Sequence, residues 1–164
     1  MTLLSGIILL AWPGQDVGCK RDALAAFQGD LRHLSGGFMR TVYVNAKRTV
    51  VYKLSKRTDY PAANGDNESE YEMMLALWKN HRMGRYATPC SLYYVEGVAV
   101  LAMVYRPVES TAVARNARWE FQQRVAEWNS EHRGDLYIGD MHDANYLATS
   151  CKRVKAIDLG RVRW

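Results

Sequence analysis

Two pairs of neighbouring strand-like segments are separated by connections that leave room only for a tight turn. Cys90–Val95 and Val98–Tyr105 both have the residue types of strands, and only two residues stand between them. Earlier in the chain, the alternating residues of HLSGGFMRTVYVN are joined to the strand-like Thr49–Leu54 by the short basic turn Asn45–Arg48. Antiparallel strands can be joined by such turns, whereas parallel strands need a crossover of about a dozen residues or more. The chain is therefore expected to build an antiparallel sheet.

Helical periodicity alternates with these strand pairs along the chain. Apolar residues recur at helical spacing in three segments: Lys20–Leu34, 67–83 and Thr111–Arg133. The second segment has Asn67 as an expected N-cap and Glu70 three residues on, as in a capping box, and Gly84 is expected to end the helix. Two short strands are expected near the end of the chain, at Tyr146–Ala148 and Val154–Ile157. This order of elements predicts an α+β fold.

Length and composition restrict the class of protein. The 164 residues suit one domain, and 48% hydrophobic with 24% charged residues is an ordinary globular composition. The formal charge of +5 fits an anionic ligand such as a nucleotide. No block of like charges and no basic stripe with interleaved aromatic residues is present, which argues against a nucleic-acid partner.

The cysteines and the N-terminal run bear on the compartment. The three cysteines are widely spaced and include no C-x-x-C pair, which disfavours a zinc ribbon or a disulfide framework and favours a reducing compartment. The apolar run near the N-terminus is about ten residues long, too short to span a bilayer. It also lacks the basic flank and cleavage site of a secretory signal. A buried strand or short helix is expected there, with no membrane partner and a cytoplasmic location.

Two acidic stretches carry the strongest functional signal. IGDMHDAN holds Asp140 and Asn145 five positions apart, and AIDLG holds Asp158. The interval between Asn145 and Asp158 has room for one small hairpin that would bring the two side chains together. Each stretch alone is typical of a turn. Together with a glycine-containing loop, a strand lysine at Lys53 and a helix glutamate, in this chain order, they match the parts of a kinase-like phosphotransferase.

The chain resembles a very small member of the protein kinase-like superfamily over Leu34 to Gly160. Its GDMHDAN loop is closer to the G-D-L-H-x-x-N form of aminoglycoside and choline phosphotransferases than to the H-R-D-L-K-x-x-N of eukaryotic protein kinases. Similar loops occur in small kinase-like proteins of bacteria and their phages. The resemblance implies one kinase-like domain, with an antiparallel N-lobe sheet, an αC-type helix and a truncated C-lobe. The expected divisions are an N-terminal extension (1–33), an N-lobe (34–106) and a reduced C-lobe (107–164).

By this resemblance the site would bind ATP and Mg²⁺. Asp140 would accept or orient the proton of the attacking hydroxyl as the catalytic base. Lys53 would hold the α and β phosphates, as in the family. Asn145 and Asp158 would be the metal ligands, since Mg²⁺ prefers hard oxygen donors.

A helix glutamate would hold Lys53, and three are available. Glu70 is favoured because apolar residues follow it on the pattern that faces the core. Glu72 is the second candidate and Glu68 also lies in the first turns. The alternative interpretation is that all three complement the dipole at the helix N-terminus.

The nucleotide itself would be held largely by main-chain groups. Amides around Ser35–Met39 would cover the phosphates, where glycine permits close approach. The segment Val104–Arg106 would receive the adenine, with Met103 at the back wall. The expected nucleotide-binding residues are Ser35, Gly36, Gly37, Phe38, Lys53, Met103 and Tyr105.

The sequence also departs from the family pattern. Met39 stands where a third loop glycine is usual, and Ile138 replaces the first histidine of the catalytic loop. Four residues follow Gly160, so no activation segment is expected within this sequence, and an apolar patch that a homodimer would cover is expected instead.

Two functions from different classes follow. The first is a minimal ATP- and Mg²⁺-dependent kinase that transfers the γ-phosphate to a hydroxyl of a protein, a small molecule or itself. The second is a catalytically weak or inactive kinase-fold module, a pseudokinase, that binds and regulates a partner protein.

Overall fold

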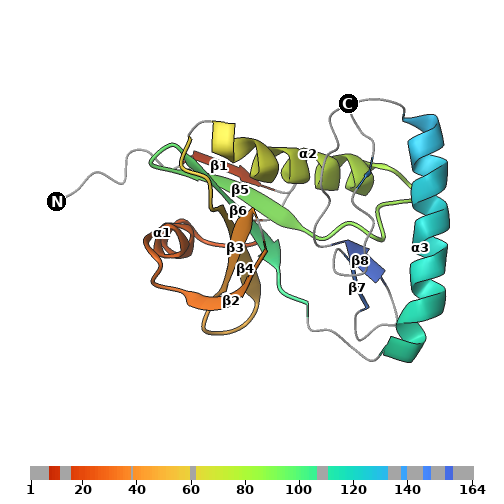
Figure 1. Cartoon of the computed structure of the whole chain (residues 1–164), viewed down its shortest axis with the longest axis horizontal. Coiled ribbons are helices and arrows are strands. Elements are labelled where there is room, and N and C mark those ends of the chain that lie inside the picture. The colour runs from red at the N-terminus through yellow and green to blue at the C-terminus, as the bar shows by residue number, and fades with distance from the viewer. Residues whose placement is uncertain are drawn as a thin grey trace. The chain divides into compact units, whose positions relative to one another are not determined.

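The computed structural model describes residues 8–11, 16–37, 39–59, 62–106, 111–132, 138–139, 146–148 and 154–156. Within them the protein has an α+β fold with one six-stranded and one two-stranded antiparallel sheet (Figure 1). The α+β class expected from the sequence is confirmed. The chain forms two compact units, one of Met1–Tyr71 and Pro89–Tyr105, the other of Glu72–Thr88 and Arg106–Trp164.

The first unit contains the six-stranded sheet, in the order β1-β5-β6-β4-β3-β2 with every neighbouring pair antiparallel. Its strands are β1 (Ile8–Ala11), β2 (Arg32–Gly36), β3 (Arg40–Val44), β4 (Val50–Ser55), β5 (Cys90–Val95) and β6 (Val98–Val104). The turn that joins β5 to β6 has positive φ at both central residues, 52° at Glu96 and 80° at Gly97. This geometry matches the twist of the flanking strands, and the expected hairpin is confirmed.

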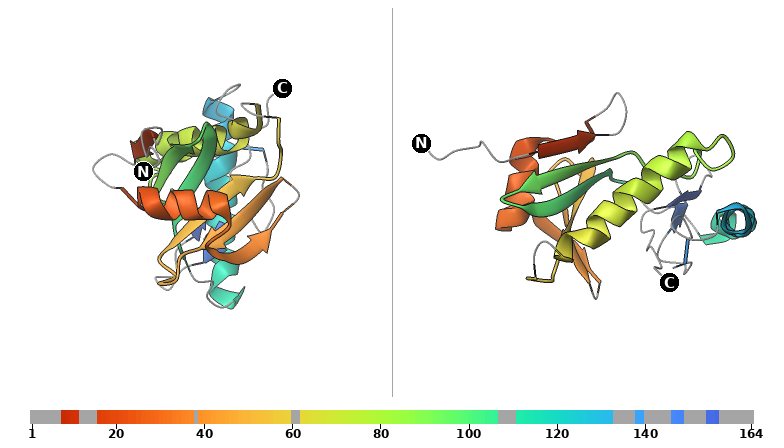
Figure 2. Two further views of the ribbon diagram at one scale, coloured as in Figure 1. Left: turned by 90° about the vertical axis from the view of Figure 1, so that its left-hand side faces the viewer. Right: turned by 90° about the horizontal axis from the view of Figure 1, so that it is seen from above.

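Helices lie on both faces of this sheet (Figure 2). Successive strand residues point to opposite faces, so Tyr52 and Lys53 of β4 separate. Tyr52 packs with Ala23 and Ala26 of α1 (Lys20–Gln28) in a buried cluster. Lys53 faces the other way, toward the first turns of α2 (Gly65–Lys79), which follows a short 3-10 helix at Ala62–Asn64.

The first helix is shorter than expected, and the prediction of a helix over Lys20–Leu34 is wrong beyond Gln28. Gly29 adopts the left-handed conformation with φ 82°, and the next amide, of Asp30, donates to Ala25 O at 2.8 Å. This arrangement satisfies the last helical carbonyls and ends the helix. The residues that follow form β2, which pairs with β3 at the edge of the sheet.

The expected capping box of α2 is also wrong. The helix begins at Gly65, so Asn67 lies inside it and is fully buried. The Asn67 amide donates to Lys53 O at 3.1 Å and Ala99 O at 2.9 Å, which attaches α2 to two strands. The helix ends at Lys79, before Gly84, whose added Cβ would lie 2.8 Å from Trp78 O.

The second unit is built around α3 (Thr111–Glu131), two residues shorter than expected. The strands β7 (Tyr146–Ala148) and β8 (Val154–Ala156) form a hairpin with Tyr146 opposite Ala156. Phe121 of α3 is buried against Tyr86 with ring centroids 4.8 Å apart, and the Ala156 amide donates to Tyr86 O at 2.9 Å. None of the described helices combines the length and apolar composition needed to cross a bilayer.

Candidate functional site

Lys53 occupies an interior position of the sheet. It lies on β4 between β3 and β6, opposite Val42 and Leu101, and its side chain is only 7% exposed. A strand lysine is more usual at a solvated edge, because burial of an ammonium group without a partner is costly. The position therefore requires an anionic or strongly polar neighbour.

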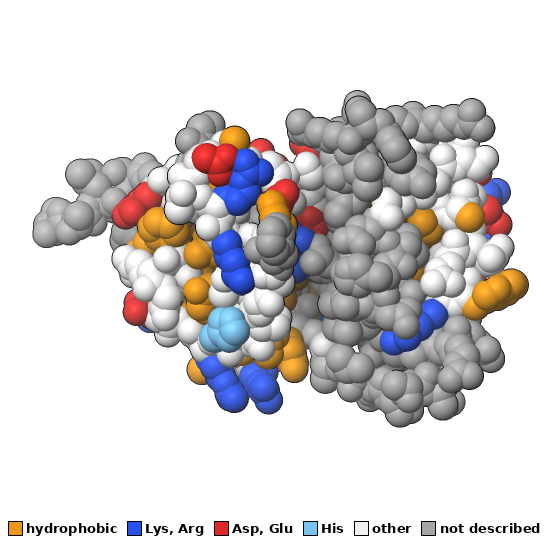
Figure 3. All heavy atoms as spheres, viewed as in Figure 1, with side chains coloured by type: hydrophobic (Ala, Val, Ile, Leu, Met, Phe, Trp, Pro, Cys, Tyr) orange, Lys and Arg blue, Asp and Glu red, His pale blue; other side chains and the backbone are white. Residues whose placement is uncertain are grey.

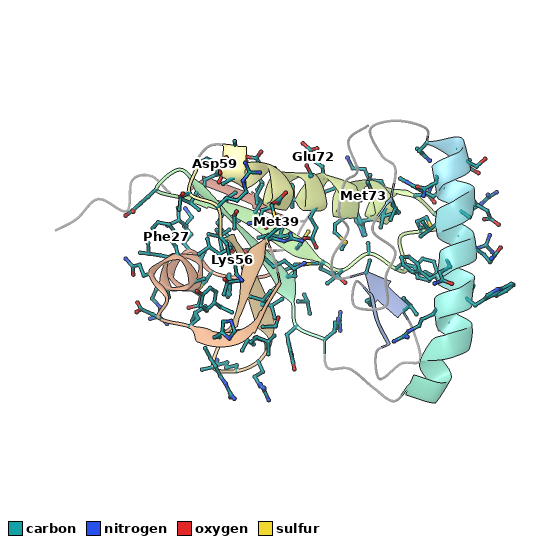
Figure 4. The ribbon with its side chains drawn as sticks, in the orientation of Figure 1. Phe27, Met39, Lys56, Asp59, Glu72 and Met73 are labelled. Atoms are coloured by element: carbon teal, nitrogen blue, oxygen red, sulfur yellow. The ribbon has the colours of Figure 1, made fainter. Side chains whose placement is uncertain are left out.

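Glu70 of α2 supplies that neighbour. Lys53 Nζ lies 2.8 Å from Glu70 Oε1 and 3.0 Å from Oε2, and the glutamate side chain is 1% exposed. Of the three glutamates considered, Glu68 accepts instead from Tyr94 OH at 2.7 Å, and Glu72 is exposed on the outer side of α2 (Figure 4). Residues two apart on a helix point in nearly opposite directions, so Glu68 and Glu72 lie on a different side of α2 from the Glu70 carboxylate that pairs with Lys53.

Arg40 is a second cation on the same carboxylate. Its Nη1 hydrogen-bonds Glu70 Oε2 and lies 3.3 Å from Asn67 Oδ1, and its side chain is 12% exposed. Arg40 pairs with Ser55 across β3 and β4, two positions from the pair of Val42 and Lys53, so it shares the face of Lys53. Three elements therefore meet at Glu70: β3, β4 and α2.

The expected phosphate loop is a tight hairpin between β2 and β3. Ser35 and Gly36 belong to β2, and the Gly37 amide donates to Arg40 O at 3.0 Å. Lys56, the residue directly after β4, holds the hairpin, since its amide donates to Met39 O at 2.8 Å and its Nζ to Gly37 O at 2.7 Å (Figure 4). The Gly37 amide is thus already used within the protein.

Exposed cations gather over this part of the sheet (Figure 3). The described basic side chains of β2–β4 and their connections that are exposed are Arg32, Lys47, Arg48, Lys56 and Arg57. Of these, Arg57 pairs with Asp59 at the surface, and this hydrogen bond lowers the pKa of the Asp59 carboxyl.

The segment expected to receive adenine lies at the end of β6. Met103 is 1% exposed and faces the same side of the sheet as Lys53, two positions beyond the Leu101 that opposes it. The Val104 amide donates to Pro89 O at 3.1 Å, and the Tyr105 amide donates to Thr49 O at 2.8 Å. Two main-chain amides of this segment therefore already donate hydrogen bonds to carbonyl groups of the protein.

Cys90 is a further titratable group near the Lys53–Glu70 pair. Its side chain is fully buried on β5, opposite Met103. Burial raises the pKa of the Cys90 thiol, Glu70 raises it further, and Lys53 acts in the opposite sense. The group therefore stays a neutral thiol and adds no charge to the cluster.

Phe38, Asp140, Asn145 and Asp158 lie outside the described residues, so their expected roles stay predictions. The structure does describe the chain beside them. Ile138, two residues before Asp140, is buried and exchanges two 2.8 Å hydrogen bonds with the Asn129 side chain of α3. Thr88 Oγ1 donates to Ala156 O at 2.6 Å, two residues before Asp158. Among the described residues alone, no three His, Cys, Asp or Glu side chains are grouped as a metal site would need.

Sequence reasoning missed Arg40 and Asn67. A signal for Arg40 was present, because it alternates with Val42 and Val44 and so shares their face of a strand. That face could be matched to Lys53 only once the register of β3 against β4 was known. Asn67 was interpreted as a cap, and no local signal indicates that its amide joins two strands.

The fold of this chain is similar to that of a solved kinase structure. The chain is similar to Legionella pneumophila Lpg2603 kinase bound to IP6, with a TM-score of 0.57 and 16% sequence identity. The match covers 83% of this chain and 50% of that one, so this chain spans about half the length of its neighbour. At this identity the likeness concerns the fold alone. No protein-family model and no curated protein matches the sequence.

Proposed function

We propose that this chain is an ATP- and Mg²⁺-dependent phosphotransferase that transfers the γ-phosphate to a hydroxyl group. The observation that carries the proposal is the buried ion pair of Lys53 and Glu70, on the sheet face that Met103 shares. Buried ion pairs add little net stability compared with well-packed apolar residues. A role in holding an anionic ligand explains why the chain keeps one here, and the similar kinase fold supports the same conclusion.

ATP fits the chemistry of the described residues. Lys53 is a compact cation aligned by Glu70, which suits it to phosphate oxygens. The adenine would lie against the segment Val104–Arg106. Because the amides of Val104 and Tyr105 already donate within the protein, the proposal assigns adenine to other main-chain groups of this segment.

Mg²⁺ is assigned to Asn145 and Asp158, whose oxygens are the ligands that it prefers. Their positions in the chain support a shared site. Asn145 directly precedes Tyr146, Asp158 follows Ala156 by two residues, and Tyr146 and Ala156 are paired at one end of the β7–β8 hairpin. When bound, Mg²⁺ would neutralise charge on the phosphates.

Asp140 is assigned the role of catalytic base toward the acceptor hydroxyl. In phosphoryl transfer most of the rate enhancement comes from positioning and electrostatics, and the base mainly orients the attacking group. The acceptor is a hydroxyl of a protein, of a small molecule or of this chain itself. A radiolabelled-phosphate assay can test each of these three acceptor types separately.

The direct test is calorimetry with ATP, in the presence and absence of Mg²⁺. The parent protein should bind ATP more tightly with the metal. In Asp158→Asn most of this gain in ATP affinity with Mg²⁺ should be lost, because the substitution replaces a charged metal ligand with a neutral one. The matched control is Asp59→Asn, an exposed acidic residue that should leave binding unchanged. Equal affinity with and without Mg²⁺ in the parent would remove the metal from the proposal.

A second readout is stability. A ligand that binds only the folded state stabilises it by about 2.7 kcal/mol at a hundredfold excess over Kd. A thermal shift with Mg²⁺ and ATP should therefore be evident. The absence of any shift with every nucleotide would contradict the proposal.

A binding module without catalysis is the second candidate. The specific observation in its favour is Met39 at the hairpin, 37% exposed, where a glycine would let the main chain approach phosphates more closely. Such a module would act by docking a partner protein. Failure of the parent to transfer phosphate to any acceptor, with its binding of a partner unchanged by Asp140→Asn, would favour this candidate.

A further inference from the structure

Arg40 belongs both to the β2–β3 hairpin and to the cluster around Glu70. Its main-chain carbonyl accepts the Gly37 amide at 3.0 Å and so closes the hairpin. Its side chain hydrogen-bonds Glu70 Oε2 and Asn67 Oδ1 on α2. One residue thus connects the loop expected to cover phosphates with the helix that carries the partner of Lys53.

The cluster is buried enough for this connection to be strong. The side chains of Arg40, Lys53 and Glu70 are 12%, 7% and 1% exposed. Hydrogen bonds between charged groups strengthen as water is excluded, and they are shorter and stronger than neutral ones. The Arg57–Asp59 pair, at 43% and 56% exposure, is the surface counterpart in the same unit, where such a pair contributes little.

Glu70 cannot move without affecting both cations. Lys53 lies within 3.0 Å of both carboxylate oxygens, and Arg40 shares Oε2. Asn67 reinforces the arrangement, since it accepts from Arg40 at 3.3 Å and donates to Lys53 O at 3.1 Å. A displacement of the hairpin is therefore transmitted through Arg40 to the carboxylate that positions Lys53.

We propose that Arg40 is a positioning residue that couples the Gly37–Arg40 hairpin to the Lys53–Glu70 pair. Through Glu70 it determines where the Lys53 ammonium is held relative to the hairpin. Its effect on nucleotide affinity rests on the proposed function, whereas its effect on the hairpin does not.

The structural half is tested by hydrogen exchange in the nucleotide-free protein. Arg40→Gln should raise the exchange rate of the Gly37 amide about tenfold, because the hairpin is released from α2, and Arg40→Lys should restore part of the protection. Arg57→Gln is the matched control, an arginine of the same unit in a surface pair, and should leave this amide unchanged. Unchanged exchange in Arg40→Gln would overturn the proposed coupling.

The functional half is tested by ATP affinity with Mg²⁺ in a double-mutant cycle. Arg40→Gln alone should raise Kd about tenfold, or about 1.4 kcal/mol, slightly less than the usual contribution of one hydrogen bond to a charged group. In a Glu70→Gln background the same change should weaken Kd less than twofold, because Arg40 acts through Glu70. A residue that merely supports the fold would show independent, multiplying effects, and that result would overturn the proposal.

The exchange experiment and the affinity experiment together distinguish a failure of this inference from a failure of the proposed function. If the parent binds no nucleotide, the proposed function fails, and the exchange of the Gly37 amide still decides whether Arg40 couples the hairpin to α2. If Glu70→Gln does not fold, the exchange experiment on Arg40→Gln decides in the same way. If the parent binds nucleotide and Arg40→Gln binds it equally well, the proposed role of Arg40 fails and the proposed function stands.

Discussion

Glu70 is the residue on which the described part of the site depends most. It accepts hydrogen bonds from Lys53 and Arg40, and at 1% exposure water cannot replace it as their partner. Removal of one partner from a buried ionic cluster lowers stability by more than the net contribution of the cluster, because the remaining charges are left without a counter-ion. Glu70 therefore contributes to stability as well as to the position of Lys53.

We expect Glu70→Gln to lower the free energy of unfolding by about 3–5 kcal/mol, because two buried cations lose their shared carboxylate. Urea denaturation monitored by circular dichroism measures the change. The control is Asp59→Asn, which breaks the exposed pair with Arg57 and should leave the unfolding midpoint essentially unchanged. A similar loss of stability in both variants would show that the Glu70 cluster contributes no more to stability than an exposed ion pair.

Asp140→Asn should separate catalysis from binding. As a base that acts on the acceptor, Asp140 is expected to matter in the transition state, so the variant should bind ATP with nearly unchanged affinity. Turnover should fall by about 10² to 10⁴, the usual contribution of a positioned general base. Radiolabelled phosphate transfer, including transfer to the chain itself, measures the rate. A full rate in this variant would remove Asp140 from the mechanism.

At the scale of elements, the ends of helices decide which segments become strands. Gly29 ends α1 in a left-handed conformation, and this frees the residues from Arg32 onward to form β2. The edge strand β2 then positions the hairpin whose other side is β3. The left-handed conformation of Gly29 therefore helps to place the hairpin expected to cover phosphates.

Gly29→Ala should lower the free energy of unfolding by about 1–2 kcal/mol, the usual cost of a left-handed conformation at a residue with a Cβ. Nothing lies within 4 Å of the added Cβ, so the backbone conformation is the whole cause. Gly65→Ala is the control, because its added Cβ also meets nothing and Gly65 is the first residue of a helix. That variant should be as stable as the parent or slightly more so, and an equal loss in both would contradict the argument.

At the scale of the whole molecule, stability is divided between two units that each bury their own core. In the first, α1 covers a sheet face formed by Tyr52, Tyr93, Val100 and Ala102. In the second, Phe121, Val125 and Trp128 of α3 are buried. The phenols in the first core make its stability sensitive to alkaline pH.

Burial raises the pKa of Tyr52 well above its ordinary value of 10.0. Burial also raises the pKa of Tyr93, with a further contribution from the hydrogen bond to Asp16. Above pH 10 the unfolded chain loses these phenolic protons while the folded chain retains them. The stability associated with these groups is therefore complete below pH 10 and is lost as the pH rises beyond it.

The free energy of unfolding of Tyr52→Phe should fall less steeply above pH 10 than that of the parent. The difference should be at most about 1.4 kcal/mol per pH unit, the value for one proton. Urea midpoints from pH 8 to pH 11 measure it. Val50→Ala, at a residue of the same cluster without a titratable side chain, is the control and should keep the slope of the parent. Identical slopes in the parent and in Tyr52→Phe would show that Tyr52 does not contribute.

Much of the sheet could be predicted from the sequence because its signals are local. The alternation of residues and the Glu96–Gly97 turn involve neighbours in the chain, and the hairpin of β5 and β6 ends within one residue of the prediction. The wrong prediction of a helix beyond Gln28 also comes from reliance on a local pattern. The leucines after Gly29 continue the helical spacing, but the left-handed glycine ends the helix, and a periodicity count does not include that conformation.

For the site, the sequence by itself determined the candidates: a strand lysine, three glutamates within one helix, and the oxygen-bearing residues Asp140, Asn145 and Asp158. The last three lie outside the described residues, so their assignment stays a prediction. Only the tertiary structure decided that Glu70 pairs with Lys53 and that Arg40 shares its carboxylate. The reason is physical: the helix face toward the sheet and the register of β3 on β4 depend on packing between segments far apart in the chain.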